Sequence, residues 1–263
     1  MKKYQYVIVS DLHLGTKDSK CNEFLEFLEQ HPCDTLVLNG DIVDAWALNR
    51  GSKWKKKHTK VISKLLTMSN ETNIIWIRGN HDEFLSEFID GAFGNIQFKE
   101  SYILKTQEWK TSDVFIDRKF YVFHGDIIDV FITKYKWLSK IGSVGYDMAL
   151  WLNRMYNKYR AWRGLSYQSI SQKIKEGVKT ATLYINDFET AAINMAEKAG
   201  CEGVICGHIH QPADRTINNK RYLNSGDWIE NMTALVVDNN GQIELKKYET
   251  NRITTELEHR EKI

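Results

Sequence analysis

The sequence predicts an α/β protein in which buried strands alternate with covering helices. Short apolar runs occupy residues 6–10, 35–39 and 73–78, and the segments between them carry apolar side chains at helical spacing. Strands that are apolar along their whole length are typical of a parallel sheet covered on both faces. The chain has 263 residues, 42% of them hydrophobic, which is long enough to bury a sizeable core.

The remaining helices and strands are expected from the same two patterns, helical spacing and short apolar runs. Helices are expected at residues 21–30, 59–68 and 184–200, because apolar residues recur there every three or four positions. Further strands are expected where short apolar runs return, at residues 119–123, 203–206, 221–224 and 233–237.

Composition excludes several classes of protein. The net charge is only +2, so overall charge identifies no partner. The four cysteines have no CxxC spacing, and we expect buried thiols in a reducing compartment rather than zinc ligands or disulfides. The apolar start of the chain is too short for a signal peptide, and no run reaches the length of a membrane span. The expected location is the cytoplasm, either free or peripheral on the inner membrane surface.

Residues 131–184 differ from the rest of the chain. They contain ten Lys or Arg, ten aromatic residues and only two acids. We expect a single domain over residues 1–248, in which residues 131–184 form a helical, basic, aromatic cap inserted over the site. An ordinary amphipathic helix pair with a solvated basic face is the alternative. The charged tail, residues 249–263, receives no function.

Five short polar motifs each follow an apolar run, and five of the eight histidines lie inside them. The motifs are Asp11-Leu12-His13, Gly40-Asp41, Gly79-Asn80-His81-Asp82, His124-Gly125-Asp126 and Gly207-His208-Ile209-His210. Carboxylate and amide oxygens and imidazole nitrogens suit divalent transition metals. Turn formation explains single Asp or Asn residues but not the repeated histidines. The motifs therefore predict a two-metal hydrolase.

Spacing and position support a shared site. Side chains two residues apart at the end of a strand point to the same side, so Asp11 with His13, and His208 with His210, can each face one metal ion. In open α/β sheets, sites form beyond the carboxyl ends of the strands. Asp41, at the end of the neighbouring strand, is the natural bridging carboxylate.

This ordered set of motifs resembles the calcineurin-like metallophosphoesterase superfamily over residues 5–240. The resemblance implies a four-layer α/β/β/α sandwich with two divalent ions, Mn²⁺ in preference to Fe or Zn²⁺, and attack on phosphorus by a metal-bound hydroxide. One ion would be held by Asp11, His13, Asp41 and His210. The other would be held by Asp41, Asn80, His124 and His208.

The residues beside the ligands have expected roles of their own. The resemblance implies that His81 contacts the phosphate and assists the leaving oxygen, as an imidazole with a pKa near neutrality can do. Asp82 is expected either to orient His81 or to cap the next helix. Asp44 and Asp126 are candidates for orienting metal ligands, with simple turn chemistry as the alternative.

Longer phrases resemble one branch, the UDP-2,3-diacylglucosamine diphosphatases. They are residues 10–15, 38–46, 206–212 and 224–228, followed by the helical insertion after His124. This branch cleaves a pyrophosphate to release UMP and a lipid-sugar 1-phosphate in lipid A biosynthesis. Its best-known members carry Arg where this chain has His81, a departure that also fits a related branch with another substrate.

Basic residues supply candidate substrate contacts, namely Arg78, Arg154, Lys158, Arg160 and Arg163. The basic, Trp-containing residues 53–58 are expected either to contact anionic lipid or to be a solvated helix start. Two other functions stay open. One is a phosphodiesterase, phosphatase or nuclease of the same superfamily, although no nucleic-acid module is recognisable. The other is a non-catalytic scaffold, whose signature would be lost ligands, and none is lost here.

Overall fold

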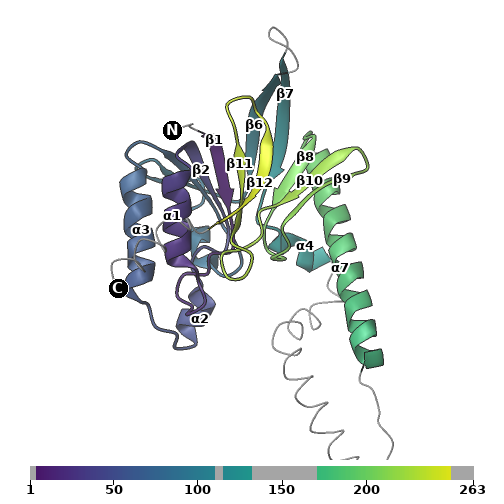
Figure 1. Cartoon of the computed structure of the whole chain (residues 1–263), viewed down its shortest axis with the longest axis horizontal. Helices are drawn as coiled ribbons and strands as arrows, with labels where there is room; N and C mark the ends of the chain where they lie inside the picture. The colour runs from purple at the N-terminus through teal and green to yellow at the C-terminus, as the bar shows by residue number, and fades with distance from the viewer. Residues whose placement is uncertain (1–3, 110–114, 132–170, 250–263) are drawn as a thin grey trace, which may run out of the picture. The chain divides into compact units, whose positions relative to one another are not determined.

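The computed structural model describes residues 4–109, 115–131 and 171–249 (Figure 1). The chain divides into two compact units, one formed by Met1–Asp126 with Ala192–Ile263 and the other by Ile127–Ala191. We call the first the sheet unit, because it contains both β-sheets. The expected cap, residues 131–184, lies largely outside the described residues, and so does nearly all of the tail. The domain organisation therefore stays a prediction.

A seven-stranded sheet forms one half of the sheet unit, with strand order β12-β11-β1-β2-β3-β5-β4. Its parallel strands are β1 (Tyr4–Val9), β2 (Cys33–Asn39), β3 (Asn73–Ile77) and β5 (Ile96–Lys99). Its antiparallel strands are β4 (Ala92–Phe93), β11 (Thr233–Val237) and β12 (Ile243–Lys247). The predicted parallel core is confirmed, and the structure adds antiparallel strands at both edges.

A second sheet has five strands in the order β6-β7-β8-β10-β9. They are β6 (Tyr102–Trp109), β7 (Phe115–Val122), β8 (Gly203–Cys206), β9 (Ala213–Ile217) and β10 (Lys220–Asn224). Strands β7, β8 and β10 are parallel, while β6 and β9 pair antiparallel at the two edges. The two edge strands were not predicted, because their polar and apolar residues are mixed.

The strands bury different residues on their two faces. Val7 and Val9 of β1 pack with the helices α1 (Cys21–Gln30) and α3 (Lys56–Met68) in one apolar cluster. Ile8, between them, belongs to a second cluster that also contains Phe120 and Leu223 of the other sheet. Alternate side chains of a strand point to opposite faces, so the two sheets pack face to face through the second cluster. Burial on both faces explains the apolar runs of the sequence.

The other described helices are short, apart from one. They are α2 (Ala45–Asn49), the 3₁₀ helix η1 (Glu83–Phe88), α4 (Asp126–Phe131) and α7 (Ser171–Lys198). Within the sheet unit, Ala192, Ile193 and Ala196 of α7 are buried. Two sheets with covering helices confirm the predicted α/β class. Among the described residues, no helix combines the length and apolar character that crossing a membrane requires.

Candidate metal centre

The polar motifs gather at one edge of the sheet unit. Asp11 and Asp41 follow β1 and β2, and Asn80 lies in the loop after β3. His124 and His208 lie just beyond β7 and β8 of the second sheet. Because β1, β2 and β3 are parallel to one another, and β7 is parallel to β8, the carboxyl ends within each sheet meet at one edge. The chain thus brings together residues that are up to about two hundred positions apart.

The first cluster consists of Asp11, His13 and His210, whose ligand atoms all lie within 4.8 Å of one another. Asp11 Oδ1 is 3.2 Å from His210 Nε2 and 3.9 Å from His13 Nε2. The other oxygen of Asp11 accepts a hydrogen bond of 3.0 Å from the His208 backbone N–H. That bond fixes the carboxylate so that Oδ1 faces the two imidazoles.

The second cluster consists of Asp41, His124 and His208. His124 Nδ1 lies 2.9 Å from the Asn39 carbonyl oxygen, so this nitrogen carries a hydrogen that it donates to that oxygen. The other ring nitrogen, Nε2, lies 3.2 Å from Asp41 Oδ2. A lone pair and a carboxylate at that distance repel each other unless a proton or a cation lies beside them.

Asp41 connects the clusters. Its Oδ2 also lies 3.9 Å from His13 Nε2 and 4.0 Å from His81 Nε2, and these three residues form a third cluster. Its Oδ1 accepts a 2.8 Å hydrogen bond from the His81 backbone N–H. Asp41 is therefore held in place by one oxygen and offers the other to imidazoles on both sides, as a bridging carboxylate requires.

Four buried polar atoms of the motifs make no hydrogen bond with any described residue: Asp11 Oδ1, Asn80 Oδ1, His81 Nδ1 and His124 Nε2. Buried acceptors without donors are rare in folded proteins, and each one needs an explanation. Carboxylate oxygen, amide oxygen and imidazole nitrogen are all ligands for divalent transition metals. The residues present therefore fit divalent metal ions.

The charges of the site reinforce one another. Burial alone would raise the pKa of Asp41, but the imidazoles of His124, His13 and His81 hold it well below its usual range. Burial opposes a charge on His210, yet the Asp11 carboxylate raises the pKa of His210 to about 9. In the absence of metal, protonated imidazoles and ionised carboxylates stabilise each other. Metal ions would compete with these protons for the same nitrogen and oxygen atoms.

The backbone of the motifs is strained. Asp11, His13, Asp41, His208 and His210 all have positive φ angles, between 48° and 67°. Such left-handed residues are uncommon outside glycine, and they cluster at functional sites where the surrounding structure holds them. The strain places five candidate ligands on tight loops rather than on regular strands, and it indicates a site fixed before any ion or substrate binds.

Two glycines make room for this packing. Gly40 has a φ of 80°, and a Cβ at this position would overlap the His124 ring. A Cβ at Gly207 would lie 2.5 Å from both Asp11 Oδ2 and Ser10 Oγ. Only glycine lets the backbone approach the ligands this closely.

Comparison with known proteins identifies the family. The model of the family described as calcineurin-like phosphoesterase matches residues 4–212. The chain belongs to the calcineurin-like phosphoesterase family. Members of this family use divalent metals, which agrees with the clusters described above.

Two curated relatives of this phosphoesterase cover most of its length. The UDP-2,3-diacylglucosamine hydrolase of Shewanella frigidimarina (strain NCIMB 400) is 24% identical over 243 residues, which are 89% of this chain and 93% of the relative. The UDP-2,3-diacylglucosamine hydrolase of Wigglesworthia glossinidia brevipalpis is 23% identical over 248 residues, 92% of this chain and 93% of the relative. Among solved structures, YfcE, a phosphoesterase from E. coli, has 13% identity and a TM-score of 0.40, covering 95% of this chain and 100% of its own.

Asp44 holds two histidines of the phosphoesterase site. Its Oδ2 lies 3.1 Å from His13 Nδ1 and its Oδ1 lies 3.0 Å from His81 Nδ1. It also caps α2, because Oδ1 accepts a 2.6 Å hydrogen bond from the Ala47 backbone N–H. Burial opposes a charge on His81, but Asp44 and Asp41 raise the pKa of His81 above its usual value. The predicted contact between Asp44 and a candidate ligand is present.

We expect Asp44→Asn to lower metal affinity or turnover by about 10- to 100-fold, the usual effect of losing a group that orients a ligand. Asn still caps α2, but its single amide oxygen cannot replace the two carboxylate oxygens that face the two imidazoles. Metal titration and steady-state kinetics on a diester substrate measure the two effects. Asp117→Asn is the matched control, because Asp117 is an exposed residue of β7 that accepts a hydrogen bond from Gln107. Equal behaviour of the two variants would contradict the role of Asp44.

Asp82 stands at the N-cap position of η1, but its side chain makes no capping hydrogen bond. Its carboxylate accepts hydrogen bonds from the backbone N–H groups of Gly79, Ile42 and Asp41, at 2.6, 2.9 and 3.3 Å. It also accepts a 3.3 Å hydrogen bond from Trp76 Nε1, and it caps η1 with no side-chain bond. Its fully buried oxygens are thus used by the backbone of two site loops, and none of these bonds comes from His81. The expected role of Asp82 in orienting His81 stays a prediction.

Asp82→Ala is therefore expected to lower stability rather than to alter chemistry alone. The change leaves several buried donors without an acceptor, at about 1–3 kcal/mol for each. A total of about 3 kcal/mol lowers the melting temperature by roughly 6–12 °C for a chain of this size. Thermal unfolding followed by circular dichroism measures the shift, with Asp117→Ala on the exposed surface as the control. An unchanged melting temperature would contradict the structural role.

Arg78 is held by acids rather than left free. Its Nε and Nη2 lie 3.2 and 3.1 Å from the Glu100 carboxylate, and its Nη1 lies 3.5 Å from Asp126 Oδ2. A phosphate would compete with both carboxylates for this guanidinium, and a contact between Arg78 and substrate stays a prediction. The other predicted substrate contacts lie outside the described residues: Arg154, Lys158, Arg160 and Arg163.

Sequence reasoning missed two residues that contact the site. Asn231 Nδ2 donates a 2.9 Å hydrogen bond to the His210 carbonyl oxygen and a short one to Asp227 Oδ2. The ring of Trp46 lies 4.4 Å from the ring of His81, centre to centre, at an angle of 34°. Trp46 stands two residues after Asp44, which was the available signal. Asn231 gave no signal in the sequence, because nothing in its neighbourhood links it to the loop that carries His210, some twenty residues earlier.

Proposed function

We propose that this phosphoesterase cleaves the pyrophosphate of UDP-2,3-diacylglucosamine to UMP and a lipid-sugar 1-phosphate. The observation that carries the substrate is the likeness to two UDP-2,3-diacylglucosamine hydrolases, which extends over 93% of each relative. The reaction type is supported by the family and by the clusters that share Asp41.

The candidate ligands divide into two sets around Asp41. Asp11, His13, Asp41 and His210 would hold one divalent ion, and Asp41, Asn80, His124 and His208 the other. When bound, the ions would supply Lewis acidity at a phosphoryl oxygen. Asp41 would fix the position of the two sets relative to each other. Its backbone N–H donates a hydrogen bond to Asp82, and its Oδ1 accepts one from the His81 backbone N–H.

His81 is proposed to act on the leaving oxygen. Its Nε2 lies 4.0 Å from Asp41 Oδ2 and therefore faces the centre of the site, while Nδ1 is turned toward Asp44. The imidazole is about one-fifth exposed, so a substrate can reach it. In this position it can donate a hydrogen bond, or a proton, to the oxygen that departs.

Residues 131–184 are proposed to cap the site and to hold the acyl chains and phosphates. The compact unit Ile127–Ala191 lies between His124 and His208 in the sequence, as an insertion between two ligand loops requires. The basic and aromatic composition of this segment supports the proposal, and its basic residues 154, 158, 160 and 163 are the contacts we expect.

Product analysis tests the proposal. Protein loaded with Mn²⁺ is incubated with UDP-2,3-diacylglucosamine and, separately, with bis-p-nitrophenyl phosphate. We expect UMP to be released by the wild type and not by Asp41→Ala. Release of UDP, or hydrolysis of the generic diester alone, would contradict the proposed substrate while leaving the family chemistry intact.

A further inference from the structure

One segment of the sheet unit carries many basic residues and no acids. Residues 45–70 contain no Asp or Glu, although acids make up 34 of the 263 residues of the chain. The same segment carries these cations: Arg50, Lys53, Lys55, Lys56, Lys57, Lys60 and Lys64. It covers α2, the loop after it and α3.

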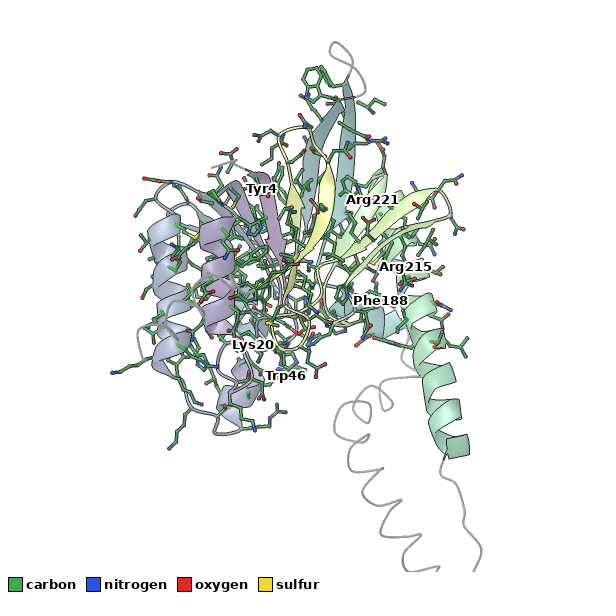
Figure 2. All side chains as sticks on the ribbon, in the orientation of Figure 1. Tyr4, Lys20, Trp46, Phe188, Arg215 and Arg221 are labelled. Atoms are coloured by element: carbon green, nitrogen blue, oxygen red, sulfur yellow. The ribbon has the colours of Figure 1, made fainter. Side chains whose placement is uncertain are left out.

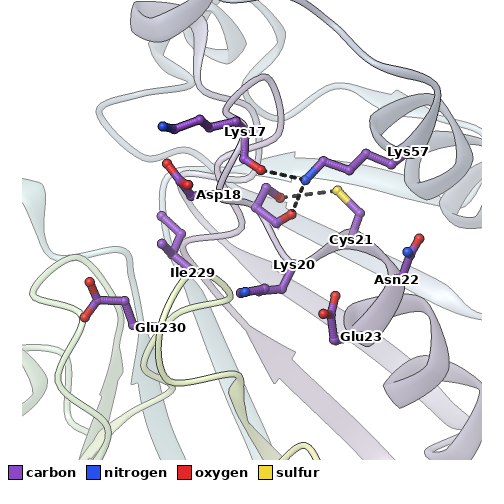
Figure 3. A pocket seen from close by; sticks show the side chains of 10 residues that line it. Lys17, Asp18, Lys20, Cys21, Asn22, Glu23, Lys57, Ile229 and Glu230 are labelled. Carbon is purple, nitrogen blue, oxygen red and sulfur yellow. Dashed lines mark hydrogen bonds between the residues drawn. The ribbon is translucent and has the colours of Figure 1, made fainter.

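Two of these cations serve the fold. Lys57 Nζ donates hydrogen bonds of 2.9 and 2.6 Å to the carbonyl oxygens of Lys17 and Ser19, beside a pocket of about 410 Å³ (Figure 3). Lys64 Nζ lies 3.6 Å from a Glu29 carboxylate oxygen. These contacts tie α3 to the loop before α1 and to α1 itself.

The other five basic residues make no contact of this kind with the described part of the chain. Arg50, Lys53, Lys55, Lys56 and Lys60 are exposed, and none of them forms an ion pair with any residue that the structure describes. We call these five residues the basic rim. Five cations within eleven residues repel one another, and an anionic surface placed against them would relieve that repulsion.

Exposed tryptophans accompany the basic rim. Trp54, between Lys53 and Lys55, is 41% exposed, and Trp46 at the start of α2 is 42% exposed. Trp46 is labelled in Figure 2. The Trp54 Nε1–H donates a 2.9 Å hydrogen bond to Thr59 Oγ1, so its polar group is satisfied within the chain. A ring of this kind, with a satisfied polar edge and an exposed body, suits the interface between water and lipid.

The basic rim also lies beside the metal centre. α2 and α3 follow β2, and both begin on the side of the sheet where the strands end and the motifs meet. Trp46 contacts the ring of His81, and Asp44 caps the same short helix. A surface that contacts the rim is therefore brought close to the site.

We propose that the basic rim, with Trp54, is the surface by which this protein docks on an anionic lipid bilayer. The choice of lipid over another polyanion rests on the proposed function, since a diacylated substrate resides in a bilayer. Each cation near an anionic membrane strengthens binding about fivefold, so three of them together contribute about 100-fold. The attraction acts within about 8 Å of the surface at physiological ionic strength and weakens as salt rises.

Vesicle co-sedimentation of the full-length, Mn²⁺-loaded protein tests the docking surface. Vesicles of phosphatidylglycerol mixed with phosphatidylcholine are compared with vesicles of pure phosphatidylcholine. The test variant is Lys53→Gln/Lys55→Gln/Lys56→Gln. The matched control is Lys105→Gln/Lys119→Gln/Lys247→Gln, which removes the same charge from exposed positions elsewhere on the sheet unit. Hydrolysis of bis-p-nitrophenyl phosphate should be equal in all three proteins, which shows that each is folded and active.

We expect the wild type and the control to bind anionic vesicles in a salt-dependent manner, and the test variant to bind about 100-fold more weakly. Absence of wild-type binding, or equal loss in both variants, would overturn the proposal. Binding of single-stranded DNA through the rim with equal or higher affinity would overturn the choice of lipid. The vesicles contain no substrate, so failure of the proposed reaction leaves this result readable by itself.

Discussion

Asp41→Ala is expected to abolish metal binding and hydrolysis together. Asp41 Oδ2 faces imidazoles of both ligand sets, at 3.2 Å from His124 Nε2 and 3.9 Å from His13 Nε2, so its loss affects both ions at once. A metal centre supplies several kcal/mol of transition-state stabilisation, and each 1.36 kcal/mol corresponds to a factor of ten. We therefore expect turnover to fall by about 10³-fold or more.

Metal content by mass spectrometry and hydrolysis of bis-p-nitrophenyl phosphate are the two measurements for Asp41→Ala. Asp117→Ala is the control, because Asp117 is an exposed residue of β7 that accepts a hydrogen bond from Gln107. The control should keep both the ions and the activity. A variant at position 41 that retains two ions, or full activity, would show that Asp41 is not the bridging ligand.

His81→Ala is expected to separate metal binding from catalysis. His81 joins Asp41 and His13 in one cluster, but neither proposed ligand set includes it. Its loss should leave the metal content unchanged and slow turnover by about 10²–10⁴-fold, the range for lost acid–base assistance. The packing partner Trp46 loses one face of contact, which should alter stability little because Trp46 is already 42% exposed.

The His81 prediction is checked by metal analysis and by kcat measured at saturating substrate. His31→Ala is a matched control, because His31 stacks on Phe27 at the end of α1 and lies outside the site. Loss of an ion from His81→Ala would mean that His81 is a ligand rather than a residue that acts on substrate. Unchanged kcat would exclude it from the chemistry.

The candidate ligands were predictable because several signals agree at each of them. An apolar run marks a buried strand, a glycine marks a tight turn, and Asp or His follows directly, as at Gly40-Asp41 and Gly207-His208. Parallel strands deliver their carboxyl ends to one edge, so residues far apart in sequence were expected to meet there. The structure brings the six Asp and His candidates into three-residue clusters, and Asn80 presents a buried oxygen without a donor.

The supporting contacts were not predictable, because they depend on partners distant in sequence. Asp82 follows a candidate ligand and a histidine, yet its carboxylate serves the backbone of the Asp41 loop, some forty residues earlier. Arg78 was expected to contact phosphate. Its guanidinium instead pairs with Glu100, directly after β5, and with Asp126 of the His124 motif. Edge strands β6 and β9 gave no clear period, because their polar and apolar residues do not alternate strictly.

The strained loops connect fold to chemistry. Five candidate ligands hold left-handed backbone conformations, each of which costs of order 1–3 kcal/mol. The buried cluster between the two sheets and the packing around Gly40 and Gly207 supply the rigidity that keeps them there. A site preorganised in this way needs little rearrangement when an ion or a phosphoryl group arrives.

Anomalous diffraction from crystals of the Mn²⁺-loaded protein tests the two-metal site most directly. Two peaks per chain are expected, one among Asp11, His13 and His210 and the other among Asn80, His124 and His208, with Asp41 contacting both. A single peak, or a second peak away from these residues, would contradict the two-metal centre on which the proposed reaction depends.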